Sequence, residues 1–222
     1  MIAAVARRFD CVPGVTCLQL YPREGNYPVS AAGQHILIES LIADRWVTRS
    51  YTITSPACSE GPVEITVKRE PKGCFSSWLF EGAIEDKLFR ISEPTGNKTW
   101  ESSASATVCV VAGIGVTPAI AILRTMLAQG KRAPLHIDYS INNRDGAAFV
   151  TEIEHAAAEH PSITCTIRDT SRYGRISDGD ISGLTHRFED AFYHLCGPPA
   201  FVGFVEGALM SNGIVADAIK TE

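Results

Sequence analysis

Short runs of apolar and β-branched residues fill the first hundred positions, and proline and glycine clusters such as Pro13-Gly14 and Gly61-Pro62 separate them. Little of this region has helical periodicity, so the pattern predicts a small antiparallel β-barrel. The expected strands span residues 2–8, 16–21, 35–40, 48–54, 63–69 and 88–92, and one short helix spans 76–81.

From residue 107 the pattern changes to apolar strands that alternate with longer amphipathic stretches. We expect strands at 107–112, 135–140, 163–167, 191–195 and 214–219, and helices at 117–129, 147–160, 180–188 and 200–212. This alternation predicts an α/β domain with a doubly wound parallel sheet. The small polar run 101–106 lies where the pattern changes, so we expect one domain at 1–101 and a second at 102–222.

The composition is typical of a folded globular protein and argues against two classes of partner. The 222 residues are 45% hydrophobic and 20% charged, and the net charge of −5 gives a nucleic acid no electrostatic support. No apolar run reaches membrane-spanning length. The N-terminal arginines follow the first apolar residues, the reverse of a signal peptide, so we predict a cytoplasmic protein that does not bind a membrane.

The cysteines and histidines predict no metal site. The 7 cysteines are scattered along the chain, and none has the tight spacing that plant-type iron–sulfur clusters need. Separated cysteines in odd number indicate reduced thiols. The 6 histidines show no metal-ligand spacing. We therefore predict no iron–sulfur cluster and no other metal in this chain.

Residues 110–118 have the pattern of a strand, a glycine turn and a helix start. Gly113 and Gly115 would let the backbone approach a phosphate, and the N–H groups and dipole at the helix start would favour its charge. Pro118 sacrifices no hydrogen bond in a first helical turn. Such a turn after the first strand of a doubly wound sheet lies at the ligand edge. A tight turn required only for packing is the alternative.

Residues 49–55 concentrate a cation, an aromatic ring and 4 hydroxyl side chains. In a strand, Arg49 and Tyr51 would share one face, and Ser50 and Thr52 the other. Alone, this stretch also fits an amphipathic strand with one solvated arginine.

Together these motifs resemble the ferredoxin–NADP reductase superfamily. The pattern Arg49-x-Tyr51-Thr52 is similar to its flavin signature, residues 113–118 to its nucleotide phosphate loop, and Cys196-Gly197-Pro198-Pro199 to its late nicotinamide motif. The motifs occur in the family's order over nearly the whole chain. The most similar branches are the flavohaemoglobin reductase domains and the reductases of Rieske-type oxygenases.

The resemblance implies a flavin site in the first domain. Arg49 would bind the flavin phosphate, Tyr51 would stack on the ring, and Thr52 would offer its hydroxyl to flavin N5. A second element would bind the pyrophosphate through a glycine turn, a helix start and two cations. Alternatively, the two cations only mark a solvated strand end. FAD is favoured, with FMN as the alternative. The remaining flavin-site candidates are Ser50, Val67, Lys68, Arg69, Gly73, Ser76 and Ser77.

The resemblance also implies a nucleotide site in the second domain. Cys196 would lie beside the reacting nicotinamide carbon, the alternative being a buried structural cysteine, and Glu222 matches a glutamate that relatives carry near their C-terminus. The adenosine end would be read near the close of the third strand. Arginine there would suit the 2′-phosphate of NADPH and Asp169 the hydroxyls of NADH, so both nucleotides stay open. The other nucleotide-site candidates are Gly113, Gly115, Val116, Thr117, Pro118, Arg168, Arg172, Gly197 and Pro198.

We therefore predict a flavin-dependent NAD(P)H oxidoreductase. It would pass a hydride from NADH or NADPH to bound FAD and then single electrons to a protein acceptor: a ferredoxin, a haem protein or a Rieske-type oxygenase component. Two alternatives stay open: a reductase of free flavin, and a flavin-binding electron-transfer subunit that is active only in a complex.

Overall fold

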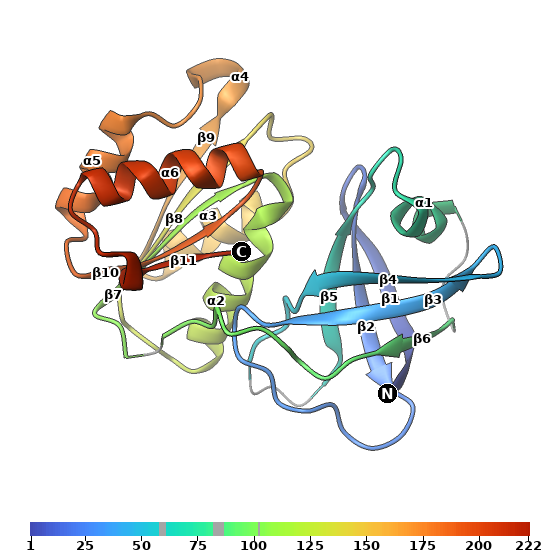
Figure 1. Ribbon diagram of the computed structural model, residues 1–222. Coiled ribbons are helices and arrows are strands. Elements are labelled where there is room, and N and C mark those ends of the chain that lie inside the picture. The colour runs from blue at the N-terminus through green and yellow to red at the C-terminus, as the bar shows by residue number, and fades with distance from the viewer. Residues whose placement is uncertain (58–60, 82–86, 102) are drawn as a thin grey trace. The chain divides into compact units, whose positions relative to one another are not determined.

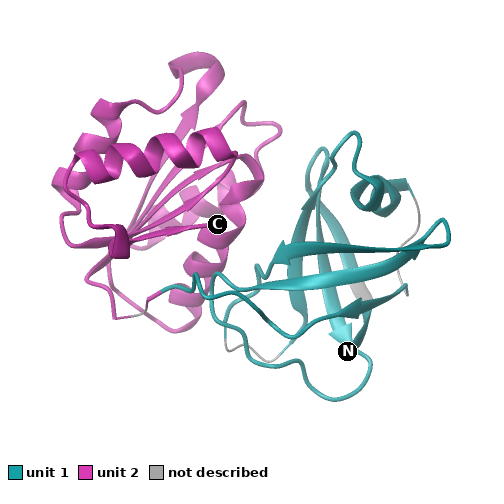
Figure 2. Cartoon of the chain, viewed as in Figure 1, with its two compact units in different colours: residues 1–100 teal, residues 101–222 magenta. Residues whose placement is uncertain are grey.

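The computed structural model describes residues 1–57, 61–81, 87–101 and 103–222 (Figure 1). The chain divides into two compact units, residues 1–100 and 101–222 (Figure 2). Cys58 and Ser102, which entered the reasoning on cysteines and on the domain boundary, lie outside the described residues.

The first unit is built on one antiparallel sheet that curls into a half-barrel. Its edge strands approach each other through a bridge between Ile53 and Ile65, which confirms the predicted barrel architecture. The strands follow the order β4-β3-β6-β1-β2-β5. Their bounds are β1 Ile2–Val12, β2 Val15–Pro22, β3 His35–Ile42, β4 Arg45–Thr52, β5 Val63–Lys68 and β6 Leu88–Ile91.

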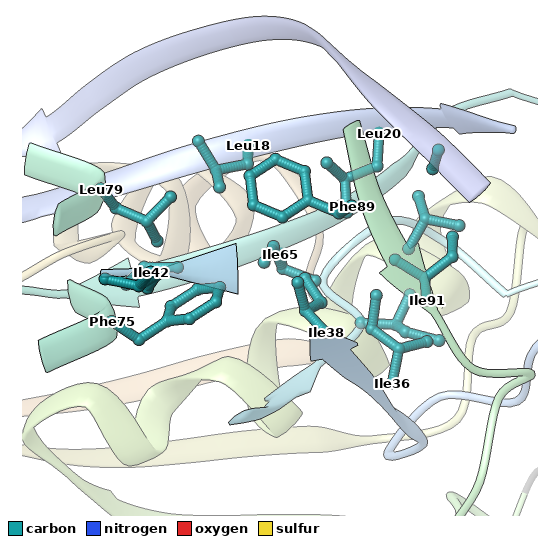
Figure 3. Packing of buried hydrophobic residues seen from close by; sticks show 14 residues of the cluster. Leu18, Leu20, Ile36, Ile38, Ile42, Ile65, Phe75, Leu79, Phe89 and Ile91 are labelled. Carbon is teal, nitrogen blue, oxygen red and sulfur yellow. The ribbon is translucent and has the colours of Figure 1, made fainter. Parts of the chain in front are cut away.

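The core of this unit lies inside the half-barrel. Figure 3 shows aliphatic side chains of the strands meeting the rings of Phe75 and Phe89, whose centroids lie 6.4 Å apart. Phe75 and Leu79 come from the short helix α1, Cys74–Glu81, and both are buried. Helical spacing turns these two residues toward the sheet, so the helix is held by the core that it helps to close.

The second unit is a five-stranded parallel sheet with the order β11-β10-β7-β8-β9, and it confirms the predicted doubly wound domain. Helices α5 and α6 cover one face, and α2 and α3 lie on the other (Figure 1). The strands are β7 Ala106–Ala112, β8 Leu135–Ile141, β9 Ile163–Asp169, β10 Ala191–Cys196 and β11 Ile219–Thr221. The helices are α2 Thr117–Ala128, α3 Val150–Glu159, α4 Thr170–Tyr173, α5 Asp178–Arg187 and α6 Pro199–Ser211.

Two sequence predictions for this unit were wrong in ways that bear on the site. The last strand begins at Ile219 and not at residue 214, because Ala216–Ala218 form a 3₁₀ turn and only Ile219–Thr221 pair in parallel with β10. The third strand runs to Asp169 and not to 167, so Arg168 lies in the sheet and not in a loop.

All five strands of the second unit point the same way, so their carboxyl ends lie at one edge of the sheet. Ala112, Ile141, Asp169 and Cys196 end four of these strands. Of the helices in the described part of the chain, none is long and apolar enough to cross a membrane.

Candidate functional site

The predicted flavin stretch lies at the open edge of the half-barrel. Arg49 pairs in register with Ile38, and Tyr51 with Ile36, two residues that are fully buried. Arg49 therefore stands on the core-facing side of β4 and is nevertheless exposed. Among the described strands, β4 pairs only with β3 until the Ile53 bridge, so its other edge is open beside Arg49 and Tyr51.

The Tyr51 ring connects the two predicted flavin elements. It packs at 6.0 Å, centroid to centroid, against the ring of Phe75 in helix α1. Burial raises the pKa of the Tyr51 phenol to about 12, although the nearby Arg49 charge lowers it. The ring is thus a neutral, half-buried plane with a cation near it.

The fold makes little use of the polar groups of this stretch. In the part of the chain that the structure describes, the hydroxyls of Ser50, Tyr51 and Thr52 make no hydrogen bond. Arg49 donates only to the carbonyl of Thr48, at 2.7 Å, and no carboxylate of the described residues pairs with it. Unused donors beside an aromatic ring suit a ligand that carries both a phosphate and a planar ring system.

The second flavin element is tied up more by its own turn. The Ser76 hydroxyl is buried and accepts the backbone N–H of Glu70 at 3.1 Å. A Cβ on Gly73 would lie 2.4 Å from that hydroxyl oxygen, so only glycine fits there. The Ser77 hydroxyl donates to the Glu70 carbonyl at 3.4 Å. The donors left free at this turn are the backbone N–H groups in the first turn of α1, not the serine hydroxyls.

The neighbouring side chains of β5 are also occupied. Val67 is fully buried in the core. Lys68 pairs with Glu70 at 3.9 Å, and Arg69 pairs with Glu81 at 3.5 Å. These pairs are half exposed, so each contributes little and either cation can be drawn to a stronger anion.

The predicted phosphate loop is a tight 3₁₀ turn, Gly113–Val116, between β7 and α2. Gly113 has a φ of 56°, a conformation that favours glycine, and its carbonyl accepts the Tyr139 hydroxyl at 3.0 Å. The Thr117 hydroxyl is turned back to the Ile114 carbonyl at 3.3 Å, and Pro118 lies in the first helical turn. The backbone N–H groups at the start of this turn are the donors available to a phosphate, because the Thr117 N–H donates to the Ile114 carbonyl and Pro118 has no N–H.

This loop touches the second nucleotide motif directly. A Cβ on Gly115 would lie 2.6 Å from the carbonyl carbon and oxygen of Cys196, and 2.7 Å from the nitrogen of Gly197. A Cβ on Gly197 would lie 3.1 Å from the Cβ of Ala112. Strands β7 and β10 are neighbours whose connections run in opposite directions, and such a topological switch point is where open α/β sheets bind ligands.

Cys196 and Glu222 come together across two parallel strands. The register pairs Leu195 with Thr221, and the backbone N–H of Glu222 donates to the Leu195 carbonyl at 3.0 Å. Burial, and then the Glu222 charge, raise the pKa of the Cys196 thiol to about 12. Although Glu222 as a residue is exposed, burial of its carboxyl raises the pKa of Glu222 to about 7. At neutral pH the Cys196 thiol is therefore protonated, and the neighbouring Glu222 carboxyl is partly ionised.

The three candidates for adenosine recognition have different fates. Asp169, the last residue of β9, caps α4 by accepting the Ser171 N–H at 3.0 Å, and the Ser171 hydroxyl lowers its pKa. Arg172 is exposed and 3.5 Å from the Asp169 carboxylate. Arg168 is mostly buried in an ion pair with Asp180 at 2.9 Å. The strand end therefore holds a buried carboxylate that caps α4, one exposed cation, and a second cation that is paired and mostly buried.

Comparison with known proteins assigns both units. Residues 26–100 match the family model of the oxidoreductase FAD-binding domain, and residues 109–207 match that of the oxidoreductase NAD-binding domain. The chain belongs to the ferredoxin reductase-like family of flavin-dependent NAD(P)H oxidoreductases.

Individual relatives of this ferredoxin reductase-like chain agree with the assignment. It is 28% identical to an NADPH oxidoreductase of Mycobacterium tuberculosis, over 82% of this chain and 49% of the relative. It is 27% identical to a flavohemoprotein of Deinococcus radiodurans, over 98% and 57%. The chain thus spans about half the length of the curated relatives that it matches. The flavohem-like FAD/NAD-binding domain of a Vibrio cholerae nitric oxide dioxygenase has the same fold, with a TM-score of 0.88 at 24% identity, covering 100% of this chain and 97% of that one.

Within each domain, the structure also places residues that the sequence did not single out beside the predicted site residues. The Phe75 ring packs against the Tyr51 ring. The Tyr139 hydroxyl donates to the Gly113 carbonyl. Asp180 forms an ion pair with Arg168. The inward helical spacing of Phe75 and Leu79 could have identified Phe75. No sequence signal could have paired Arg168 with Asp180, because the contact joins separate elements, β9 and α5.

The contact at the switch point predicts that Gly115→Ala will damage nucleotide binding by this reductase. The added methyl must displace the Cys196–Gly197 backbone, and overpacking of this kind costs about 1–3 kcal/mol. We expect calorimetric titration to show NADH and NADPH affinities reduced about tenfold. Gly203→Ala, in a helix where an added Cβ meets nothing within 4 Å, is the control and should bind as the parent does. An unchanged affinity in Gly115→Ala would show that no nucleotide depends on this contact.

The Cys196–Glu222 pair predicts a pH-dependent thiol reactivity. Glu222→Gln removes a negative charge that raises the pKa of Cys196, so more thiolate should form at a given pH. We expect iodoacetamide to alkylate Cys196 about twofold faster or more in the variant. The difference should appear only above about pH 7, where Glu222 is ionised in the parent protein. Mass spectrometry of the Cys196 peptide measures the rate, and the exposed Cys74 is the internal control. Equal alkylation rates in the variant and the parent above pH 7 would show that the Glu222 charge does not affect the pKa of Cys196.

Proposed function

We propose that this chain oxidises NADH or NADPH with FAD and delivers single electrons to a haem or iron–sulfur centre of a protein acceptor. The observation that carries the proposal is the set of polar groups that the fold leaves unused at both motifs. These are the hydroxyls and guanidinium of residues 49–52 and the N–H groups at the start of the 3₁₀ turn Gly113–Val116. Family membership supplies the reaction class.

In the FAD domain, the residues of β4 would bind and orient the cofactor. Arg49 would hold phosphate oxygens with its planar fork, Tyr51 would stack on the ring, and the Thr52 hydroxyl would reach flavin N5. The backbone N–H groups of the first turn of α1 would meet the pyrophosphate, because Ser76 is committed to its turn. When bound, FAD accepts a hydride from the reduced nicotinamide and releases electrons one at a time.

In the NAD-binding domain, the chain's own residues position the nucleotide and manage protons. The start of the Gly113–Val116 turn would bind the phosphates with backbone donors. Cys196 would give the nicotinamide a small, uncharged neighbour, because its thiol stays protonated at neutral pH. Glu222, with a pKa of about 7, would hold or release a proton close to the nicotinamide under working conditions.

We also propose a class of electron acceptor for this chain. Relatives include a flavohemoprotein and a domain of a nitric oxide dioxygenase. Such proteins need a flavin that accepts two electrons from a nicotinamide and passes them one at a time to a one-electron centre. A haem protein is therefore the acceptor class that we would test first, with a ferredoxin or a Rieske-type oxygenase component next.

We expect an anaerobic visible spectrum to show a yellow protein that bleaches when NADH or NADPH is added. Bleaching would demonstrate both binding sites and the transfer from one to the other in a single experiment. Rapid turnover with free flavin would favour a free-flavin reductase over one that needs a protein acceptor. A yellow protein that neither nucleotide bleaches would instead favour an electron-transfer subunit that is active only in a complex.

We expect Arg49→Ala to weaken FAD binding about 10- to 100-fold, because it removes charge-assisted hydrogen bonds worth about 1.5–3 kcal/mol. Fluorescence titration of the flavin-free protein measures the dissociation constant. Arg45→Ala removes an exposed cation from the same strand and is the matched control. Equal flavin affinity in the Arg49 variant and the parent would place the phosphate site elsewhere.

A further inference from the structure

Arg168 is held between two carboxylates inside the NAD-binding domain. Its Nη2 lies 2.9 Å from Asp180 Oδ1 and 3.8 Å from Asp138 Oδ2. The Arg168 side chain is 13% exposed and that of Asp138 only 3%. The group joins three elements: Asp138 comes from β8, Arg168 from β9 and Asp180 from α5.

The Arg168 guanidinium contacts carboxylates that come from β8 and α5. Arg168 pairs in register with Ser140, near the carboxyl end of β8, whereas Asp138 lies two residues further back along that strand. Successive side chains on one face of a strand are two residues apart. The Arg168 head therefore reaches back toward Asp138, and it also pairs with Asp180 in the first turn of α5, where Asp180 forms a capping box with Ser177.

The two carboxylates hold this cation unequally. Burial raises the pKa of Asp138 to about 6 although Arg168 lowers it, and Asp138 Oδ1 and Arg168 Nε have no hydrogen-bond partner in the described structure. Burial opposes the ionisation of Asp180, but hydrogen bonds from Ser177 and the charge of Arg168 lower its pKa overall. Asp180 is thus the firm partner, fixed to a helix, and Asp138 the weaker one.

What remains at the end of β9 favours a neutral ribose. Asp169 is ionised there, because the Ser171 hydroxyl lowers its pKa. Its carboxylate is mostly buried and already accepts hydrogen bonds from Ser171, so it acts on the nucleotide as a nearby negative charge, which disfavours the additional phosphate of NADPH. Arg172 and Arg175 are exposed cations on the following segment, and Arg172 is paired with the Asp169 carboxylate at 3.5 Å.

We infer that Asp180 and Asp138 are specificity-determining residues, which withhold Arg168 from the adenosine ribose position and so make this reductase favour NADH over NADPH. The inference rests on the proposed function, because it requires the adenosine of the nucleotide to lie at the carboxyl end of β9. It assigns the discrimination to two carboxylates that touch Arg168 and need not touch the nucleotide themselves.

The test is calorimetric binding of AMP and of 2′,5′-ADP (adenosine 2′,5′-bisphosphate) to the whole protein, since these probes differ only by the 2′-phosphate and need no flavin. The parent should bind AMP more tightly. Asp180→Asn keeps a side-chain oxygen for the Ser177 cap and removes the charge, so Arg168 is freed to meet the phosphate. We expect it to improve 2′,5′-ADP binding relative to AMP about tenfold. Asp138→Asn should give a smaller gain and serves if Asp180→Asn does not fold.

Two controls make the result specific. Asp178→Asn removes a charge from the same helical turn, where no pairing with Arg168 occurs, and should not change the ratio. Arg168→Ala combined with Asp180→Asn should abolish the gain. If the double variant kept the gain, simple charge removal would explain it and the inference would be overturned, as it would by a parent that prefers 2′,5′-ADP. A parent that binds neither probe and is not bleached by NADH would overturn the proposed function instead.

Discussion

The close approach of two backbone segments at the switch point organises the NAD-binding unit. Gly115 and the Cys196–Gly197 peptide lie so near each other that a single methyl group would separate them. This contact sets the phosphate loop of β7 against the loop that follows β10, and the register of β11 then brings Glu222 beside Cys196. Backbone donors, a protonated thiol and a carboxyl with a pKa near neutrality therefore share one corner because two glycines permit it.

In the FAD domain, the candidate site depends on polar groups that the fold leaves without strong partners. An edge strand exposes main-chain and side-chain polar groups that a closed barrel would satisfy. Here the half-barrel closes through the Ile53–Ile65 bridge and leaves β4 open beside Tyr51, where the hydroxyls and Arg49 have no strong partner. At the neighbouring turn of Ser76, by contrast, the hydroxyls hold the backbone in place. Hydroxyl side chains are thus available to a ligand on β4, whereas at the turn of Ser76 they stabilise the fold.

Arg168 shows how an electrostatic environment can reverse the meaning of a residue. A cation at the end of the third strand would suit a 2′-phosphate if it were free. Between Asp180 and Asp138 it instead neutralises one buried carboxylate, Asp138, and one partly exposed carboxylate, Asp180; a buried carboxylate left unpaired would cost on the order of several kcal/mol. The chemistry offered to a nucleotide at this edge is then set mainly by Asp169 and by exposed charges.

The sequence by itself determined the architecture and the motifs. Turn residues between short β-branched runs specified the antiparallel unit, and alternating strands and helices specified the parallel one, because both signals are local. The glycines at 113 and 115 and the Arg-x-Tyr-Thr stretch were readable for the same reason. Tertiary structure alone decided which side chains are available. The burial of Ser76, the ion pair of Arg168, the ring of Phe75 under Tyr51 and the proximity of Glu222 to Cys196 arise from contacts between separate elements, which depend on register and packing and leave no local trace in the sequence.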